Sequence, residues 1–263
     1  MSGRFSIVGA GNLAWHLAPA LENVGYQAVG VFSRQAAKAA DLVERLYQAE
    51  VKENLNFIPD QLDFLFLTVP DDQIFQLVQS LELPKNTVIV HCSGSQSINT
   101  LDNEMTNRTG VFYPLQTFTR GKRVQFDSIP LFVEGSSTEV ARLLLKMGAK
   151  LNCDVFELDS KKRFLLHLSA VITNNLTNHL QSISEDILTE IGLDFSVMGP
   201  LLQESLEKML TIGPAKAQTG PAQRADLRIL DRHHDYLKSE NEATADIYRL
   251  ISQSILDRYH TNK

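Results

Sequence analysis

The fold is decided near the start of the chain by the stretch Phe5-Ser6-Ile7-Val8-Gly9-Ala10-Gly11-Asn12-Leu13-Ala14. Residues 5–8 predict a buried strand, and residues 12–24 predict a helix that ends before Gly25. Gly9 permits a tight turn, Gly11 lets the main chain approach a pyrophosphate, and the helix N-terminus offers free amides to phosphate. The stretch therefore predicts a dinucleotide site formed by four residues: Gly9, Gly11, Asn12 and Leu13. The alternative is a purely structural strand-to-helix turn.

Strand and helix patterns alternate after this glycine loop. The further expected strands are residues 27–32, 62–69, 87–91, 111–113 and 129–133, with a last strand around Val155, and the expected helices are residues 35–46, 72–81 and 138–147. Two of the strands, at 62–69 and 87–91, are continuous apolar runs, which are typical of strands buried on both faces of a parallel sheet. The order predicts an α/β fold with a doubly wound, mostly parallel Rossmann-type sheet.

The pattern becomes helical after about residue 159. The expected helices are residues 161–191, 201–210, 221–237 and 241–259, the last with a capping box formed by Ser239 and Glu242. We therefore expect two domains, an NAD(P)-binding Rossmann-like domain over residues 1–158 and a helical substrate and dimerisation domain over residues 159–263.

Composition excludes several function classes. The 263 residues carry a formal net charge of −6, which does not favour nucleic acid or anionic lipid as a partner. The two cysteines, Cys92 and Cys153, match neither a disulfide framework nor a metal-ligand spacing, so we expect no metal. Since no apolar run reaches the roughly 18–20 residues that span a bilayer and no signal-peptide pattern is visible, we expect a cytoplasmic protein without a membrane partner.

The residues at the end of the second expected strand indicate whether the site prefers NAD or NADP. Ser33 and Arg34 stand where NAD-selective folds place an acidic residue on the ribose 2′-hydroxyl. A guanidinium and a hydroxyl suit a 2′-phosphate, so the sequence predicts NADP in preference to NAD. The alternative is that Arg34 is a solvated surface charge. Val69 and Pro70 follow the third strand and are expected at the nicotinamide side, whereas Asp72 is interpreted as a helix cap.

Polar side chains after two further strands are candidates for chemistry. His91 and Ser93 end an expected strand, which places them near the same crevice. His91 is interpreted either as a proton donor or as a structural, substrate-orienting group, and Ser93 as a residue that lies beside the cofactor and holds the reacting group. Gln116 and Thr117, in a short loop after the next strand, are expected to bind substrate.

The long helix of the second domain carries a polar stripe. On a regular helix, His167, Asn174 and Asn178 fall within roughly 40° of one another. Such a stripe aims donors at a ligand carbonyl or imine, and His167 is the first choice as proton donor. The alternative is a polar network between helices or a dimer seam. Gln218 and Thr219, before an expected helix N-terminus, are the remaining candidates for substrate binding.

Taken together, these segments resemble a known family, the Rossmann-like NADP oxidoreductase proteins whose C-terminal helical domain is a domain of unknown function. The resemblance covers essentially the whole chain. The segments that carry it are Gly9–Ala14, Phe32–Arg34, Val69–Asp72, His91–Ser95, Tyr113–Phe118, Gln218–Ala222, His167 and the cluster of Asn174, Asn175 and Asn178.

The resemblance implies an architecture similar to that of pyrroline-5-carboxylate reductases and other 6-phosphogluconate-dehydrogenase-like enzymes, with a homodimer formed through the C-terminal helices. Some 3-hydroxyacid dehydrogenases of this larger group use a helix Lys followed four residues later by Asn, but this chain has His167 and Val171 at that spacing. Their mechanism therefore does not carry over residue by residue.

Three functional hypotheses follow. The first is an NADP-dependent oxidoreductase that moves hydride between nicotinamide and a small carbonyl or imine, or the corresponding alcohol or amine. In it, His167 or His91 exchanges the proton while Asn174, Asn178 and Ser93 hold the reacting group. The second is a non-catalytic NADP(H)-binding sensor or assembly protein. The third is hydride exchange between NADP and a deazaflavin.

Overall fold

The computed structural model describes residues 3–127 and 129–260. The chain divides into two compact units, Met1–Thr173 and Asn174–Lys263. This division falls inside a helical stretch, later in the chain than the boundary at residue 158 that we expected from sequence.

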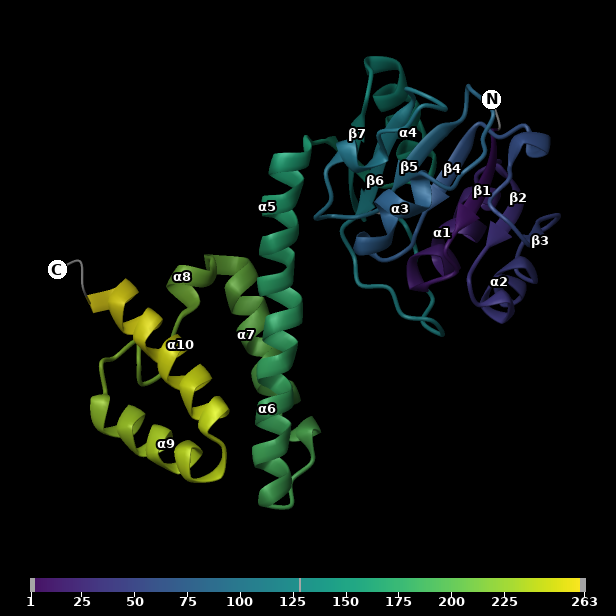
Figure 1. Ribbon diagram of the computed structural model, residues 1–263. Helices are drawn as coiled ribbons and strands as arrows, with labels where there is room; N and C mark the ends of the chain where they lie inside the picture. The colour runs from purple at the N-terminus through teal and green to yellow at the C-terminus, as the bar shows by residue number, and fades with distance from the viewer. Residues whose placement is uncertain (1–2, 128, 261–263) are drawn as a thin grey trace. The chain divides into compact units, whose positions relative to one another are not determined.

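The first unit is built on one eight-stranded sheet with the order β3-β2-β1-β4-β5-β6-β7-β8 (Figure 1). Its strands are β1 (Arg4–Val8), β2 (Gln27–Phe32), β3 (Glu50–Lys52), β4 (Phe64–Leu67), β5 (Val88–His91), β6 (Thr109–Pro114), β7 (Pro130–Gly135) and β8 (Asp154–Glu157). Every neighbouring pair is parallel except β6 and β7. The predicted Rossmann-type α/β fold is therefore confirmed, and the strands from β1 to β6 end at one carboxyl edge.

The helices of the first unit are α1 (Asn12–Asn23), α2 (Ala36–Val43), α3 (Ile74–Val78), α4 (Thr138–Lys150) and α5 (Ser160–Ala170). The predicted helix at residues 72–81 is wrong in its bounds, because a 3₁₀ turn occupies Asp71–Gln73 and α3 follows it. The expected cap is also wrong, since the residue before α3 is Gln73 and no side chain caps the helix.

The core explains why the strands are continuous apolar runs. All four residues of β4 and all four of β5 are buried, because apolar clusters cover both faces of the sheet. One cluster packs against α1, α2 and α4, and the other packs against α3. The sequence missed β3, whose residues Glu50–Lys52 form a short strand at the sheet edge without an apolar run.

The second unit is helical. After a π-helical turn at Val171–Leu176, its helices are α6 (Thr177–Glu190), α7 (Gly199–Ile212), α8 (Pro214–Ala217), α9 (Leu227–Glu240) and α10 (Glu242–His260). Figure 1 shows α9 and α10 as neighbours, and these two helices contact one another.

Two of these helices begin differently from the sequence-based expectation. The helix expected from residue 221 begins only at Leu227, because Asp226 caps it and Ala225 has a positive φ of 57°. The last helix is capped by Asn241, whose Oδ1 accepts a hydrogen bond from the Thr244 N–H at 3.1 Å. The expected capping box of Ser239 and Glu242 is therefore wrong. Within the described residues, every helix is too short or too polar to cross a membrane.

Candidate functional site

The glycine loop joins β1 to α1 at the carboxyl edge of the sheet. Gly9 has a φ of 104°, and its N–H donates a hydrogen bond to the Phe32 carbonyl at 2.8 Å. A Cβ at this position would lie 2.7 Å from the carbonyl oxygen of Thr68, so only glycine fits the turn. Gly11 is the N-cap of α1 and brings no capping side chain. The first amides of α1 are thus free to bind an anion.

A cavity of about 530 Å³ opens in front of this loop. It extends from the glycine loop across the ends of β2 and β4. Its walls include Gly9, Ala10, Gly11, Ser33, Arg34, Gln35, Lys38, Thr68, Val69, Pro70, Gln73 and Leu77. Six of the nine residues predicted to bind the cofactor are in this set, whereas Asn12, Leu13 and Ser93 are not among the lining residues. The structure thus brings the ends of three strands together around one cavity.

The charge of the cavity is positive where β2 ends. Arg34 and Lys38 are exposed at the wall, and no Asp or Glu is among the described residues that line it. Ser33 shapes this corner, because its Oγ accepts a hydrogen bond from the Gln35 N–H at 3.2 Å. Lys38 was not predicted from the sequence, although its position four residues after Arg34 was visible there. Together the two side chains form a cationic corner suited to a phosphate group.

The loop after β5 is stabilised by hydrogen bonds between its own residues. The Ser93 N–H donates a hydrogen bond to Nδ1 of His91 at 3.1 Å, and the His91 side chain is fully buried. Burial lowers the pKa of His91 from 6.5 to about 4, and the positive charge of Arg163 acts in the same direction. His91 is therefore neutral near pH 7, with the geometry of a residue that anchors the loop.

Ser93 continues this internal bonding. Its Oγ accepts hydrogen bonds from the N–H groups of Ser95 at 3.1 Å and Gln96 at 3.0 Å. Ser95 in turn donates a hydrogen bond to Oδ2 of Asp71 at 2.5 Å. Asp71 directly follows the cavity residue Pro70, so these contacts connect the loop after β5 to the wall of the cavity.

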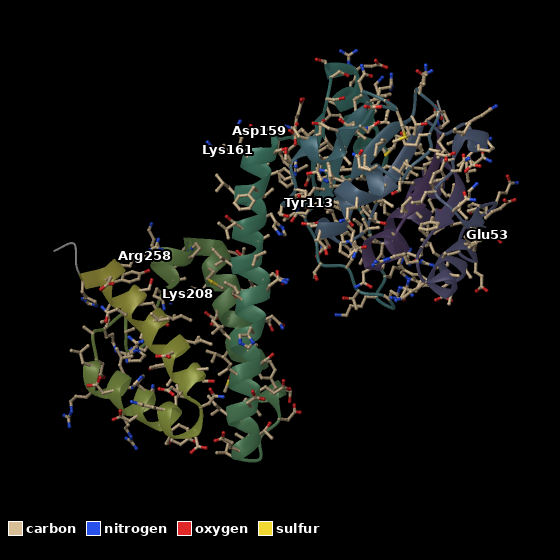
Figure 2. All side chains as sticks on the ribbon, viewed as in Figure 1. Glu53, Tyr113, Asp159, Lys161, Lys208 and Arg258 are labelled. Carbon is tan, nitrogen blue, oxygen red and sulfur yellow. The ribbon has the colours of Figure 1, made fainter. Side chains whose placement is uncertain are left out.

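Next to this loop, the end of β6 meets α5. The hydroxyl of Tyr113 and Nδ1 of His167 are 3.1 Å apart and share a hydrogen bond. Gly94 lies against both rings, because a Cβ there would be 2.7 Å from Nδ1 of His167 and 2.7 Å from Cζ of Tyr113. Burial raises the pKa of Tyr113, and the negative charge of Asp71 adds to the effect. Figure 2 shows Tyr113 on the side of the sheet beside α5. Tyr113 was not among the predicted site residues, although its place at the end of an expected strand could have indicated it.

α5 is fixed to the sheet by a buried arginine. Arg163 lies one turn before His167 and is fully buried. Its guanidinium forms an ion pair with Glu134 of β7 and donates a hydrogen bond to the main-chain oxygen of Gln96 at 2.5 Å. Oγ of Ser160 donates to the same Glu134 carboxylate at 2.7 Å. The N-terminal half of α5 is thereby held against β7 and the loop after β5.

Four of the other predicted site residues are exposed and do not line the glycine-loop cavity. Gln116 and Thr117 are exposed and bond to each other, since Oε1 of Gln116 accepts from the Thr117 N–H at 2.9 Å. Asn174 and Asn178 are exposed residues of the second unit. Asn174 lies within the π-helical turn at Val171–Leu176 and Asn178 follows it, so the regular-helix projection that grouped these residues with His167 does not apply.

Gln218 and Thr219 also belong to the second unit. Thr219 lies at the wall of a mostly apolar cavity of about 420 Å³ between α6, α9 and α10. Nε2 of Gln218 donates a hydrogen bond to the Thr219 carbonyl at 3.0 Å. The main chain turns at Pro221 and α9 begins only at Leu227, so these two residues do not stand directly before a helix N-terminus.

Comparison with known proteins assigns both halves of the chain. Residues 3–116 match the Rossmann-like domain, and residues 129–255 match the domain of unknown function DUF2520. A search of curated protein sequences found no match. A crystal structure from Bacteroides fragilis, whose proposed activity is that of an NADP oxidoreductase, is 33% identical, with a TM-score of 0.86 over 97% of this chain and 98% of that one.

Two more distant structures share the fold. A reductive aminase from Aspergillus terreus in complex with NADPH and ethyl levulinate is 16% identical, with a TM-score of 0.71 over 98% of this chain and 95% of the other. A 1-pyrroline-5-carboxylate reductase from Streptococcus pyogenes is 12% identical, with a TM-score of 0.61 over 99% of each chain. These likenesses confirm the fold of the chain that the sequence resemblance implied.

The fold and the glycine-loop cavity define the class of Rossmann-like proteins with a helical C-terminal domain. Within that class, the chain belongs to the family that pairs the Rossmann-like domain with DUF2520, and it matches its Bacteroides fragilis relative over nearly the full length of both chains.

Proposed function

We propose that this protein is an NADP-dependent oxidoreductase that moves hydride to or from a small carbonyl or imine substrate. The observation that carries the proposal is the cavity in which the glycine loop faces Arg34 and Lys38. The likeness in fold to the Aspergillus terreus reductive aminase bound to NADPH supports it.

The residues present fit the cofactor. A Cβ at Gly9 would lie 2.7 Å from the Thr68 carbonyl oxygen, so this position accepts only glycine, as the tight turn of a dinucleotide-binding loop requires. Arg34 and Lys38 provide the positive charge for a 2′-phosphate, and a carboxylate that would repel it is absent from the described lining. Val69 and Pro70 would then lie on the nicotinamide side, at the end of β4.

When bound, the nicotinamide supplies or accepts the hydride, and the chain must move the accompanying proton. We assign this proton to His167, because Nε2 has no hydrogen-bond partner among the described residues. His91 anchors the loop after β5, since it is buried and neutral near pH 7. Asn174, Asn178, Gln116, Thr117, Gln218 and Thr219 remain candidate substrate residues.

Titration calorimetry with NADPH and NADH, followed by turnover assays with small imines, keto acids and hydroxy acids, tests the proposal. We expect NADPH to bind more tightly than NADH and at least one substrate class to be turned over. His167→Asn should then lower kcat by about 10²–10⁴-fold, the usual contribution of general acid–base catalysis. Absence of NADPH binding by folded protein would refute the proposal. Binding without any turnover would instead support a cofactor-responsive sensor.

We further propose that the helical unit forms a homodimer. Large apolar side chains are exposed along α6 and α7, among them Ile187, Leu201, Leu206, Met209 and Leu210. An exposed apolar surface of this extent is typical of a subunit interface, and a second copy of the chain is its expected partner. Sedimentation equilibrium should give twice the chain mass, and Leu206→Glu should shift the equilibrium to the monomer. A monomeric wild-type protein would rule out the dimer.

A further inference from the structure

We propose that Tyr113 is the positioning residue of the proton-exchange site, holding His167 as the tautomer with hydrogen on Nε2 and replacing at Nδ1 the proton that leaves from Nε2. This inference rests on the proposed role of His167. It concerns a residue outside the sequence-predicted set, and three features of the first unit support it.

The first feature is the hydrogen bond itself. The Tyr113 hydroxyl lies 3.1 Å from Nδ1 of His167, and the two rings meet edge to face at 77° with centroids 5.9 Å apart. A neutral imidazole has one donor and one acceptor nitrogen. If the phenol donates to Nδ1, the hydrogen of the imidazole must be on Nε2, the nitrogen left free for a substrate.

The second feature is the space around the pair. Gly94 passes so close that a Cβ would lie 2.7 Å from both Nδ1 of His167 and Cζ of Tyr113. Gly94 is itself held in place, because the flanking Ser93 and Ser95 are bonded within the loop and to Asp71. The rings of Tyr113 and His167 are therefore packed against fixed main chain, which limits their rotation.

The third feature is the anchor one turn earlier on α5. Arg163 is buried and bonded to Glu134, Ser160 and the Gln96 carbonyl. These contacts fix the backbone of α5, while Tyr113 fixes the ring of His167. The histidine is thus held from two directions, as a group that exchanges protons requires.

The proton step balances without a further reactant. In the reductive direction, hydride adds to the substrate carbon and the Nε2 proton of His167 moves to the substrate oxygen or nitrogen. The phenolic proton of Tyr113 moves to Nδ1 as the Nε2–H bond breaks, so the imidazole stays neutral and Tyr113 becomes a phenolate. Solvent then returns a proton to Nε2 while the Nδ1 proton moves back to the phenolate oxygen, and the net uptake is one proton for each hydride transferred. In the oxidative direction every step is reversed.

Nitrogen-15 NMR of the imidazole in cofactor-free protein tests the resting arrangement. The His167 signals are assigned as those lost in His167→Gln, and spectra are recorded at about pH 8.5, where imidazole groups are neutral. We expect the wild-type protein to show the Nε2–H tautomer and Tyr113→Phe to shift the population toward Nδ1–H. A wild-type Nδ1–H tautomer, or identical spectra for wild type and Tyr113→Phe, would overturn the proposal.

A kinetic measurement provides the second test. We expect Tyr113→Phe to lower kcat at least about 10-fold and to leave the NADPH dissociation constant unchanged, since the altered group acts through His167. Tyr26→Phe is the matched control, because Tyr26 is a buried tyrosine of the same unit that packs on Phe64. An unchanged kcat in Tyr113→Phe would contradict the proposed proton transfer from Tyr113 to His167. If the wild-type protein binds no NADPH or turns nothing over, the proposed function fails, and the NMR result still decides the role of Tyr113.

Discussion

The buried guanidinium of Arg163 on α5 forms an ion pair with the half-buried carboxylate of Glu134 on β7. The pair joins the first helix after the sheet to an inner strand of that sheet. It also lies one helical turn before His167, so the position of the proposed proton-exchanging group depends on it.

Removal of this arginine should cost much more stability than removal of an exposed one. Arg163→Met leaves Glu134 and Ser160 without their cationic partner in the interior. We expect the free energy of unfolding to fall by about 3–5 kcal/mol, measured by urea denaturation. The control is Arg249→Met, whose ion pair with Asp246 is solvent-exposed on both sides and should contribute at most about 1 kcal/mol. Equal losses in the two variants would show that the Arg163 contacts do not fix α5.

The cationic corner of the cavity predicts coenzyme selectivity. Arg34→Ala removes a charge-assisted contact to a 2′-phosphate that contributes about 1.5–3 kcal/mol. NADPH affinity should therefore fall about 10- to 100-fold by calorimetry, with NADH affinity unchanged. Lys38→Ala should act in the same direction. Arg142→Ala, an exposed arginine on α4, is the control for loss of surface charge. A parallel loss of NADPH and NADH affinity in Arg34→Ala would refute the 2′-phosphate assignment.

Gly9 should be intolerant of a side chain for two separable reasons. Its positive φ disfavours any L-residue, and a Cβ would also lie 2.7 Å from the Thr68 carbonyl. Gly25→Ala isolates the first effect, because Gly25 has a φ of 89° and nothing within 4 Å of the added atom. We expect Gly25→Ala to lose about 1–2 kcal/mol and Gly9→Ala to lose about 1–3 kcal/mol more. Similar melting temperatures for the two variants would contradict the steric argument.

The pKa of His91 predicts an acid-sensitive fold. Between pH 6.5 and about 4 the unfolded chain binds a proton that the buried imidazole does not. The contribution of His91 to the free energy of unfolding is therefore fully present above about pH 6.5. It is lost as the pH falls toward about 4. The expected slope is at most about 1.4 kcal/mol per pH unit. His91→Gln should flatten the dependence of the free energy of unfolding on pH over this interval. An equal slope in both proteins would show that His91 does not titrate as described.

Local sequence accounted well for the elements that depend on short-range rules. The glycine loop, β1 and α1 follow from residues within a few positions of one another, and the buried strands follow from continuous apolar runs. The short edge strand β3 was missed because its three residues carry no such run. The start of α9 was misplaced because Gly220-Pro221 also suits a turn, and the choice depends on how Asp226 caps the helix.

The sequence by itself determined the Rossmann-type order and the composition of the glycine loop, because steric demands on a strand–glycine–helix turn and hydrophobic periodicity act between near neighbours. Tertiary structure alone decided which polar groups meet. Tyr113 and His167 are 54 positions apart and Arg163 and Glu134 are 29 apart, and only the packing of α5 against the sheet makes them partners. It also decided that Asn174 lies in a π-helical turn, which changes the helical phase on which a projection from His167 depends.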